Sequence, residues 1–201
     1  MEMKVRITFV APLLGTAPGN KDIYEEHIGK NSADKDRVKD ELKSLPADEL
    51  EEKGKTVFHR TADGRPMLYD YQIKGFIKEV FGVFTEFGKL PLGPKKEISK
   101  YTHKRIVDNF IFVYDREIPL SADASDLTEC VRPLRATTMR GERIALSCSE
   151  QAPTGTTIEC TIEWLHAGLE KYITQALDYG AKKGIGQWRN SGMGRFSWEV
   201  I

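Results

Sequence analysis

The sequence predicts an α+β fold of the ferredoxin-like type, in which the elements run strand, helix, strand, strand, helix, strand. Three observations support this prediction. The chain begins with an alternating apolar strand at residues 5–10, two later segments have the apolar spacing of amphipathic helices, and short apolar runs of strand length lie between and after them. A length of 201 residues is enough for a substantial hydrophobic core. We therefore predict a single domain, 1–201, in which two additions interrupt the core.

The first addition follows the first strand. Val5, Ile7 and Phe9 occupy alternate positions, as in a strand that buries one face. Residues 16–55 are then polar and rich in acidic side chains. Because a long polar segment between core elements is usually a functional insertion, we predict an acidic insertion at 16–55.

The remaining elements follow in order. A helix is expected to begin near Asp70, the predicted N-cap, because the next apolar residues recur at spacings of three and four. An apolar run predicts a strand at 108–116, and two more strands are expected at 143–148 and 157–164. Residues 117–142 are the second addition, a hairpin or long excursion that carries arginines. The second helix is predicted at about 167–182 and the last strand at 196–201.

The composition limits the classes of function. Thirty basic residues balance thirty acidic ones, so no overall field attracts nucleic acid and only local basic surfaces remain. No run approaches the roughly 18 apolar residues that a membrane span needs. Three cysteines without a CxxC pair indicate reduced thiols, and the first residues lack the features of a signal peptide. We expect a cytoplasmic protein without a membrane partner.

Motifs for metals and cofactors are missing from the sequence. It contains no calcium-loop spacing, no H-E-x-x-H and no phosphate loop of the G-x-x-x-x-G-K-[ST] type. Neighbouring acids such as Glu25-Glu26 and Glu51-Glu52 do not face each other on a helix, which favours a solvated acidic face. The sequence therefore predicts no metal and no cofactor.

A glycine-rich segment near the C-terminus is the most informative feature for function. Glycine permits positive φ and close approach of the backbone, and arginine carries a planar, permanently charged fork that suits phosphate. Trp188 and Tyr71 are candidate stacking platforms for bases. The segment therefore predicts a surface that contacts a polyanion, although a tight connection between helix and strand, in which the glycines serve only geometry, stays an alternative. The open face of an antiparallel sheet is a frequent platform for RNA. The predicted contacts in the segment are Gly184, Gly186, Trp188, Arg189, Gly192, Gly194 and Arg195.

Three segments resemble the RAMP superfamily of CRISPR-associated proteins. The glycine-rich segment is similar to the glycine-rich loop of that family, with Gly192-Met193-Gly194-Arg195-Phe196 in place of its G-x-G-[RK]-[FV]. Residues 63–75, which end in Lys74-Gly75, are similar to the turn and Lys-Gly helix of the backbone subunits of type III effector complexes. Residues 5–13 resemble the family's first strand and its Thr-Pro-Leu end. Residues 88–165 match no motif.

The resemblance implies a RAMP/RRM-like core that binds RNA, assembled with other copies of itself or with CRISPR effector subunits. It implies that Lys74 contacts phosphate. The family's Gly-Ser-Ser is replaced here by bulkier residues, which indicates a compact or divergent member, of cellular or phage origin. In type III backbone subunits the insertion after the first strand holds the aspartate that cleaves target RNA. Five candidates compete for that place: Asp22, Asp34, Asp36, Asp40 and Asp48.

The predicted function is non-catalytic binding of single-stranded RNA. Arg132, Arg135 and Arg140 are expected to extend the grip from the hairpin, although solubilising charge explains them equally well. Two alternatives stay open. One is a metal-independent endoribonuclease that uses His59 or His27 as general acid or base. The other is a phage or mobile-element protein that docks on a protein complex without RNA.

Overall fold

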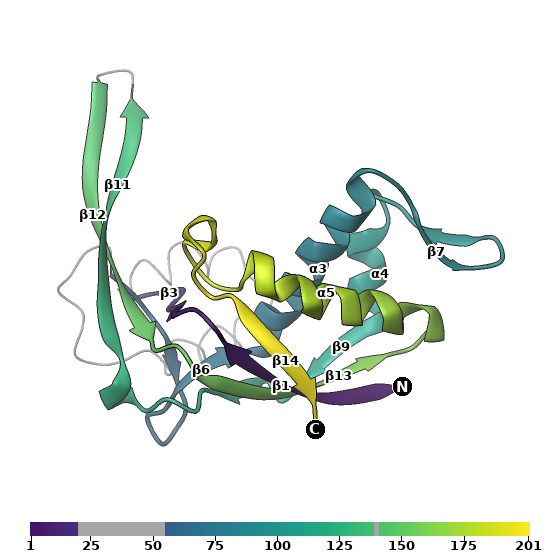
Figure 1. The fold of residues 1–201 in the computed structure, drawn as a ribbon, viewed down its shortest axis with the longest axis horizontal. Helices are drawn as coiled ribbons and strands as arrows, with labels where there is room; N and C mark the ends of the chain where they lie inside the picture. The colour runs from purple at the N-terminus through teal and green to yellow at the C-terminus, as the bar shows by residue number, and fades with distance from the viewer. Residues whose placement is uncertain (20–54, 139–140) are drawn as a thin grey trace.

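The computed structural model describes residues 1–19, 55–138 and 141–201, and its elements are shown in Figure 1. The acidic insertion predicted at 16–55 lies almost entirely outside the described residues. The helices are α3 (Asp70–Glu86), α4 (His103–Phe110) and α5 (Glu170–Lys183), with short 3-10 turns η2 (Ala124–Asp126), η3 (Ala167–Leu169) and η4 (Arg189–Ser191). The mixed α and β composition confirms the predicted α+β class.

A four-stranded antiparallel sheet forms the centre of the molecule, in the order β14-β1-β13-β9. Its strands are β1 (Glu2–Phe9), β9 (Ile111–Tyr114), β13 (Thr157–Trp164) and β14 (Phe196–Val200). Along β1 and β13 every second side chain is buried, as expected for strands that cover a core with one face. Figure 1 shows α3, α4 and α5 on one side of this sheet, so the buried side chains lie beneath the helices.

Helix α3 supplies the largest helical contribution to the core. The apolar spacing predicts a face made of Ile73, Phe76, Ile77, Val80, Phe81 and Phe84. The first five are buried, Phe84 is partly buried, and Thr85 is buried beside them. The helix begins at Asp70, one residue later than its N-cap, Tyr69. The Tyr69 backbone N–H donates to Gln72 Oε1 at 2.8 Å, so the predicted Asp70 cap is wrong by one position.

A second, five-stranded sheet contains a long hairpin that projects from the rest of the protein, as Figure 1 shows. It consists of β11 (Thr128–Thr138) and β12 (Gly141–Ala152), paired antiparallel. At the base of the hairpin β12 pairs with two short strands, β2 (Leu13–Leu14) and β4 (Lys55–Val57), and β4 pairs in turn with β3 (Ala17–Pro18). The predicted excursion at 117–142 and the predicted strand at 143–148 are therefore corrected to one hairpin from 128 to 152.

Smaller strand pairs complete the described structure. A three-stranded sheet joins β5 (His59–Arg60), β6 (Pro66–Tyr69) and β10 (Glu117–Pro119), and a separate hairpin joins β7 (Leu90–Gly93) and β8 (Lys96–Ile98). Buried Glu150 of β12 accepts from the Phe58 backbone N–H at 2.7 Å and from Arg60 Nη2 at 2.5 Å.

The strand predicted at 108–116 is shorter than expected, because residues 108–110 form the end of α4 and β9 begins only at Ile111.

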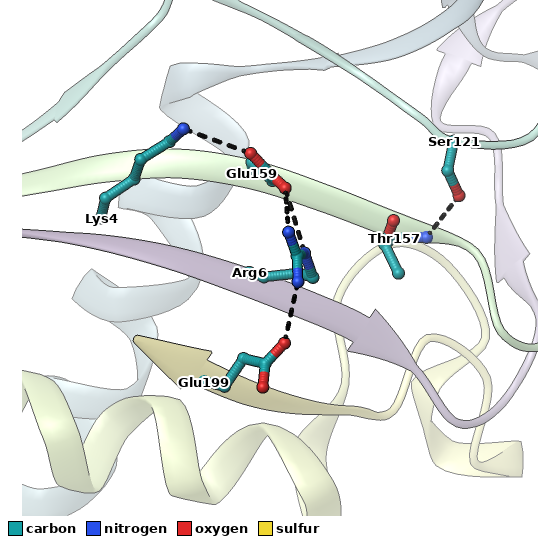
Figure 2. A network of polar contacts seen from close by, with 6 residues as sticks. All are labelled: Lys4, Arg6, Ser121, Thr157, Glu159 and Glu199. Atoms are coloured by element: carbon teal, nitrogen blue, oxygen red, sulfur yellow. Dashed lines mark hydrogen bonds and ion pairs between the residues drawn. The ribbon is translucent and has the colours of Figure 1, made fainter. Parts of the chain in front are cut away.

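The outer face of the central sheet carries paired charges, as Figure 2 shows. Arg6 lies directly between Glu159 and Glu199 in the strand register, and donates to both carboxylates at 2.7 and 3.1 Å. Lys4 forms a second ion pair with Glu159 at 3.3 Å. The hydrogen bond from Arg6 is the main reason that the pKa of Glu159 lies below its usual value. Cross-strand pairs of opposite charge of this kind support the register of a sheet.

The three cysteines form no disulfide bond, and burial is the main cause that raises the pKa of the Cys160 thiol to about 12. Within the described ranges, none of the helices combines the length and the apolar character that a transmembrane span requires.

The packing of α5 on β14 gives a direct test of this architecture. A Cβ atom added at Gly180 would lie 2.1 Å from Phe196 Cζ. We expect Gly180→Ala to destabilise the protein by about 1–3 kcal/mol through overpacking. Gly75→Ala is the matched control, since a Cβ there meets nothing within 4 Å, and it should stabilise the helix by up to about 1 kcal/mol. Chemical denaturation measures both, and equal stability of the two variants would contradict this packing.

Candidate nucleic-acid interface

The glycine-rich loop, residues 184–194, begins where α5 ends and leads into β14. Gly184 takes φ of 71°, and an added Cβ would lie 2.5 Å from the Met193 carbonyl oxygen. At Gly194 an added Cβ would lie 1.8 Å from the Ile185 carbonyl oxygen. The two ends of the loop therefore cross in contact, and the Ile185 N–H donates to Gly194 O at 2.9 Å. These two glycines are required by the chain's own packing.

The loop is attached to the segment that follows β1. The Gly194 N–H donates to the Pro12 carbonyl at 2.8 Å, and the Arg195 carbonyl accepts from the Val10 N–H at 2.8 Å. Gly186 packs against Leu13 and Leu14, where an added Cβ would lie 3.1 Å from the Leu14 carbonyl oxygen. The loop is therefore held in one position relative to the central sheet.

Arg195 and Gly192 form a local contact at the surface. Arg195 is exposed, and its Nε donates to the Gly192 carbonyl at 2.9 Å. An added Cβ at Gly192 would lie 2.6 Å from Arg195 Nη2, so the glycine makes room for the guanidinium. The charge of Arg195 has no carboxylate partner within the part of the chain that the structure describes, and it is available to an anion.

Arg189 has a different environment. It forms an ion pair with Glu79 of α3 at 2.5 Å, and Lys183 pairs with the same carboxylate at 3.0 Å. Burial alone would raise the pKa of Glu79, but the hydrogen bonds from Arg189 and Lys183 together hold it below its usual value. Two cations share one acid, so the group keeps a net positive charge.

Trp188 has the most unusual backbone of the loop. Its φ of 53° and ψ of 33° place a bulky residue in the left-handed region, which costs about 1–3 kcal/mol and persists only where the surroundings enforce it. The ring is 40% exposed, and the guanidinium carbon of Arg132 lies 5.1 Å from the ring centroid. The strained backbone thus presents one aromatic ring at the surface and against an arginine.

Arg132 occupies a position that the sequence did not indicate. The residue lies in β11 and is 7% exposed, so it is not part of an exposed arginine surface. Its Nη2 donates to Gln187 Oε1 at 2.8 Å. A cleft of about 340 Å³ opens here between the hairpin and the loop, and its lining consists of Arg132, Gly186, Gln187, Trp188, Arg189 and Asn190.

The other hairpin arginines are only partly described. Arg135 lies in β11 opposite Ile144 by backbone register, and its side chain is outside the described part of the structure. Arg140 lies outside the described residues, as do His27 and the five candidate aspartates of the insertion. The grip predicted for Arg135 and Arg140 stays a prediction.

Lys74 is not brought to the glycine-rich loop. Its Nζ donates to the Asp108 carbonyl at 3.0 Å and lies 4.8 Å from the centroid of the Phe112 ring, so it faces α4 and β9. Burial is the main cause that lowers the pKa of Lys74. Glu79, which does contact the loop, lies on another side of the same helix. A shared phosphate contact of Lys74 with the loop arginines is therefore not supported by this arrangement.

Tyr71 and His59 lie together near the start of α3. Tyr71 is 39% exposed and stacks on Tyr69, with ring centroids 5.5 Å apart. His59 is 4% exposed, and its ring packs edge-on against Tyr69 at 4.7 Å. Tyr71 can therefore offer a surface to a base, whereas the buried ring of His59 is poorly placed to exchange protons with bound RNA.

Sequence reasoning missed Gln187 and Glu79. Gln187 lies inside the glycine-rich segment, but an uncharged side chain between glycines gave no signal of its own. Glu79 is 110 residues from Arg189 and can be found only from the packing of α3 beside the loop. Within the described ranges, no three His, Cys, Asp or Glu side chains gather to hold a metal.

Comparison with solved structures identifies chains with a similar fold. One belongs to the cryo-EM structure of the type III-B Cmr-beta complex bound to cognate target RNA, with a TM-score of 0.57 and 13% identity. The match covers 100% of this chain and 60% of that one, so this chain spans only 60% of the length of its neighbour. A second belongs to a type IV-B CRISPR complex, with a TM-score of 0.50, 10% identity and coverage of 100% and 90%. No family model and no curated protein matches.

The Arg189–Glu79 pair makes a pH-dependent contribution to stability. Because the pKa of Glu79 is lowered from 4.5, this contribution is present above pH 4.5 and is lost as the pH falls through the lowered value. Glu79→Gln should therefore lower the free energy of unfolding at neutral pH by up to about 1 kcal/mol. The melting temperature should fall accordingly, and its difference from wild type should shrink in acid. Thermal unfolding from neutral to acidic pH measures this.

The matched control is Glu97→Gln, which removes an acid from the exposed pair with Lys89. It should change the melting temperature little at any pH. A difference for Glu79→Gln that stays constant down to acidic pH would show that its carboxylate does not stabilise the loop.

Proposed function

We propose that the chain is a RAMP-like protein that binds single-stranded RNA on the surface formed by the glycine-rich loop and the base of the β11–β12 hairpin. We also propose that β14-β1-β13-β9 with α3 and α5 is its ferredoxin-like core, and that it works without catalysis in a CRISPR-related complex. One observation carries the proposal: a strained Trp188 displays its ring beside a cleft that is lined by two arginines and by no acid.

The distribution of charge supports this surface over the open face of the sheet. Around Arg6 the outer face of the sheet carries Lys4 with Glu2, Glu159, Glu163 and Glu199, so acids outnumber bases there. A phosphate backbone would be repelled by this face. At the loop the described groups are Arg132, Arg189, Arg195 and Lys183 against one acid, Glu79. The neutral chain thus separates its charge between two surfaces.

The comparisons support the same proposal at the level of the fold. Both neighbours belong to CRISPR complexes, and one of those complexes is bound to target RNA. In such an assembly the partners of this chain would be RNA, other copies of itself or effector subunits. Stacking on Trp188 and phosphate contacts from Arg195 are insensitive to sequence, so we expect binding with little base preference.

The charge of the loop is tested by removing two arginines. We expect Arg189→Ala with Arg195→Ala to weaken binding of a labelled single-stranded RNA. It should also reduce the steepness of the salt dependence by up to about 1.4, because each phosphate contact contributes about 0.7. Fluorescence anisotropy across a range of salt concentrations measures both quantities.

The control removes the same charge elsewhere, in Arg65→Ala with Lys104→Ala. Arg65 lies in the turn after β5 and Lys104 lies in α4. The control should bind as wild type does. If wild-type protein purified at low salt is free of nucleic acid and shows no salt-sensitive binding, the proposal is wrong, and a protein partner should be sought.

Trp188 is tested separately from the charges. Trp188→Gly relieves the strain of the left-handed backbone but loses the buried part of the ring, so the melting temperature should fall only modestly. Loss of one stacked base, worth about 1–3 kcal/mol, should weaken RNA binding by about 5- to 150-fold. Trp188→Phe keeps an aromatic face and should retain most of the affinity. A Trp188→Gly protein that is stable and binds RNA at full strength would remove Trp188 from the site.

A further inference from the structure

We infer that the cleft between the β11–β12 hairpin and the glycine-rich loop is a binding pocket for a single phosphate group, built on the buried guanidinium of Arg132. The inference rests on the proposed function and makes it more specific, because it assigns one phosphate of the bound strand to one pocket. The pocket joins two elements, since Arg132 comes from the hairpin and Gln187 and Trp188 come from the loop.

The hydrogen bonds of Arg132 are incomplete. Its Nε and Nη1 are buried and have no hydrogen-bond partner among the described residues, while Nη2 donates to Gln187. Arginine stays charged and has five N–H groups to satisfy. Buried polar groups of proteins almost always have a partner, and a buried charge without one is especially unfavourable. An acceptor with several oxygens is therefore the expected occupant.

The position of the guanidinium is fixed before any ligand binds. Gln187 holds one nitrogen at 2.8 Å, and the Trp188 ring covers the group at 5.1 Å from its centroid. Little conformational freedom remains to be lost on binding, which favours affinity. The left-handed backbone of Trp188 places its ring beside Arg132, so the strained conformation contributes to this arrangement.

The lining of the cleft favours an anion with an attached ring. Within the lining there is no carboxylate, and Arg189 adds a second guanidinium. The volume of about 340 Å³ lies at the lower end of the range of ligand pockets, which is about 300–1,000 Å³. A phosphate with its sugar suits that size, and the exposed part of the Trp188 ring offers a stacking surface for the base. A partner's carboxylate would satisfy Arg132 but would leave the aromatic face unused.

The first experiment uses inorganic phosphate as the probe. The melting temperature of the full chain is measured in phosphate and in chloride at equal ionic strength, for wild type and for Arg132→Met. Methionine fills similar space without charge. We expect phosphate to raise the melting temperature of wild type and not that of Arg132→Met. An equal rise in melting temperature in both proteins, or no rise in either, would overturn the inference of a phosphate pocket.

A second variant guards against a failure of Arg132→Met to fold. Gln187→Glu places a carboxylate against the guanidinium, which satisfies Arg132 from within the chain and should preserve the fold. It should abolish the phosphate-dependent rise in melting temperature. A rise that persists in a folded Gln187→Glu protein would also overturn the inference. Arg65→Gln is the control for loss of an exposed arginine, and it should respond to phosphate as wild type does.

Binding assays with RNA, a mononucleotide and polyglutamate distinguish the possible ligands of the pocket. They also separate this inference from the proposed function. With single-stranded RNA, Arg132→Met should bind at least tenfold more weakly, with a salt slope reduced by about 0.7. A mononucleotide that binds as tightly as the RNA would identify a free nucleotide as the ligand, against the inference. Competition by polyglutamate but not by RNA would identify an acidic protein, also against it.

Two outcomes tell the proposals apart. If wild type binds RNA and Arg132→Met binds it equally well, the pocket is wrong and the proposed function stands. If wild type binds no RNA but shows the Arg132-dependent phosphate effect, the anion pocket stands and its occupant is not a strand, so both the proposed function and its extension to RNA fail.

Discussion

The position of β1 between β13 and β14 is the constraint on which the rest of the structure depends. Both neighbours pair antiparallel with β1. Its alternate residues Val5, Ile7 and Phe9 share the face that the helices cover, and they are fully buried there. The same pairing delivers the end of β1 to the glycine-rich loop, where Pro12 accepts from the Gly194 N–H. The loop is therefore positioned by the core itself. A change that shifted β1 by one residue would move the buried side chains to the other face and carry the loop with it.

The glycines of the loop are explained both by packing within the loop and by close approach to a ligand, and the sequence alone could not separate these two explanations. The pattern of four glycines with two arginines predicted a surface that approaches phosphate, and in the structure Gly184 and Gly194 are explained by the crossing of the loop's own ends. Their packing does not argue against binding, because it creates the fixed turn on which Trp188 and Arg189 stand. The functional signal of the motif is thus indirect: the glycines shape the loop, and in the proposed function the side chains between them make the contacts.

Local periodicity predicted the central elements, and long-range pairing set the rest. The apolar spacing predicted for α3 was correct at five positions from Ile73 to Phe81 and placed Phe84, which is only partly buried, at its end. This succeeded because the apolar face of an amphipathic helix is determined by its own sequence once a core exists to cover. The β11–β12 hairpin was misjudged, since the extent of a hairpin depends on the partner strand and on β4 beside it. The same reason hid the site: Arg132 meets Gln187 across 55 residues, and Arg189 meets Glu79 across 110. No local pattern encodes such contacts.

A neutral overall charge is compatible with the proposed anion binding, because the charges are segregated by element. Arg6 is neutralised within the sheet by Glu159 and Glu199, which sit opposite it on the neighbouring strands. Among the described residues, the Arg195 side chain donates to a backbone carbonyl and to no carboxylate, and two buried nitrogens of Arg132 have no hydrogen-bond partner. Paired cations stabilise a register and attract nothing further, whereas cations with neutral or missing partners retain their attraction for anions. The pairing of each arginine, and not the count of charges, therefore decides where on this molecule a phosphate backbone would bind.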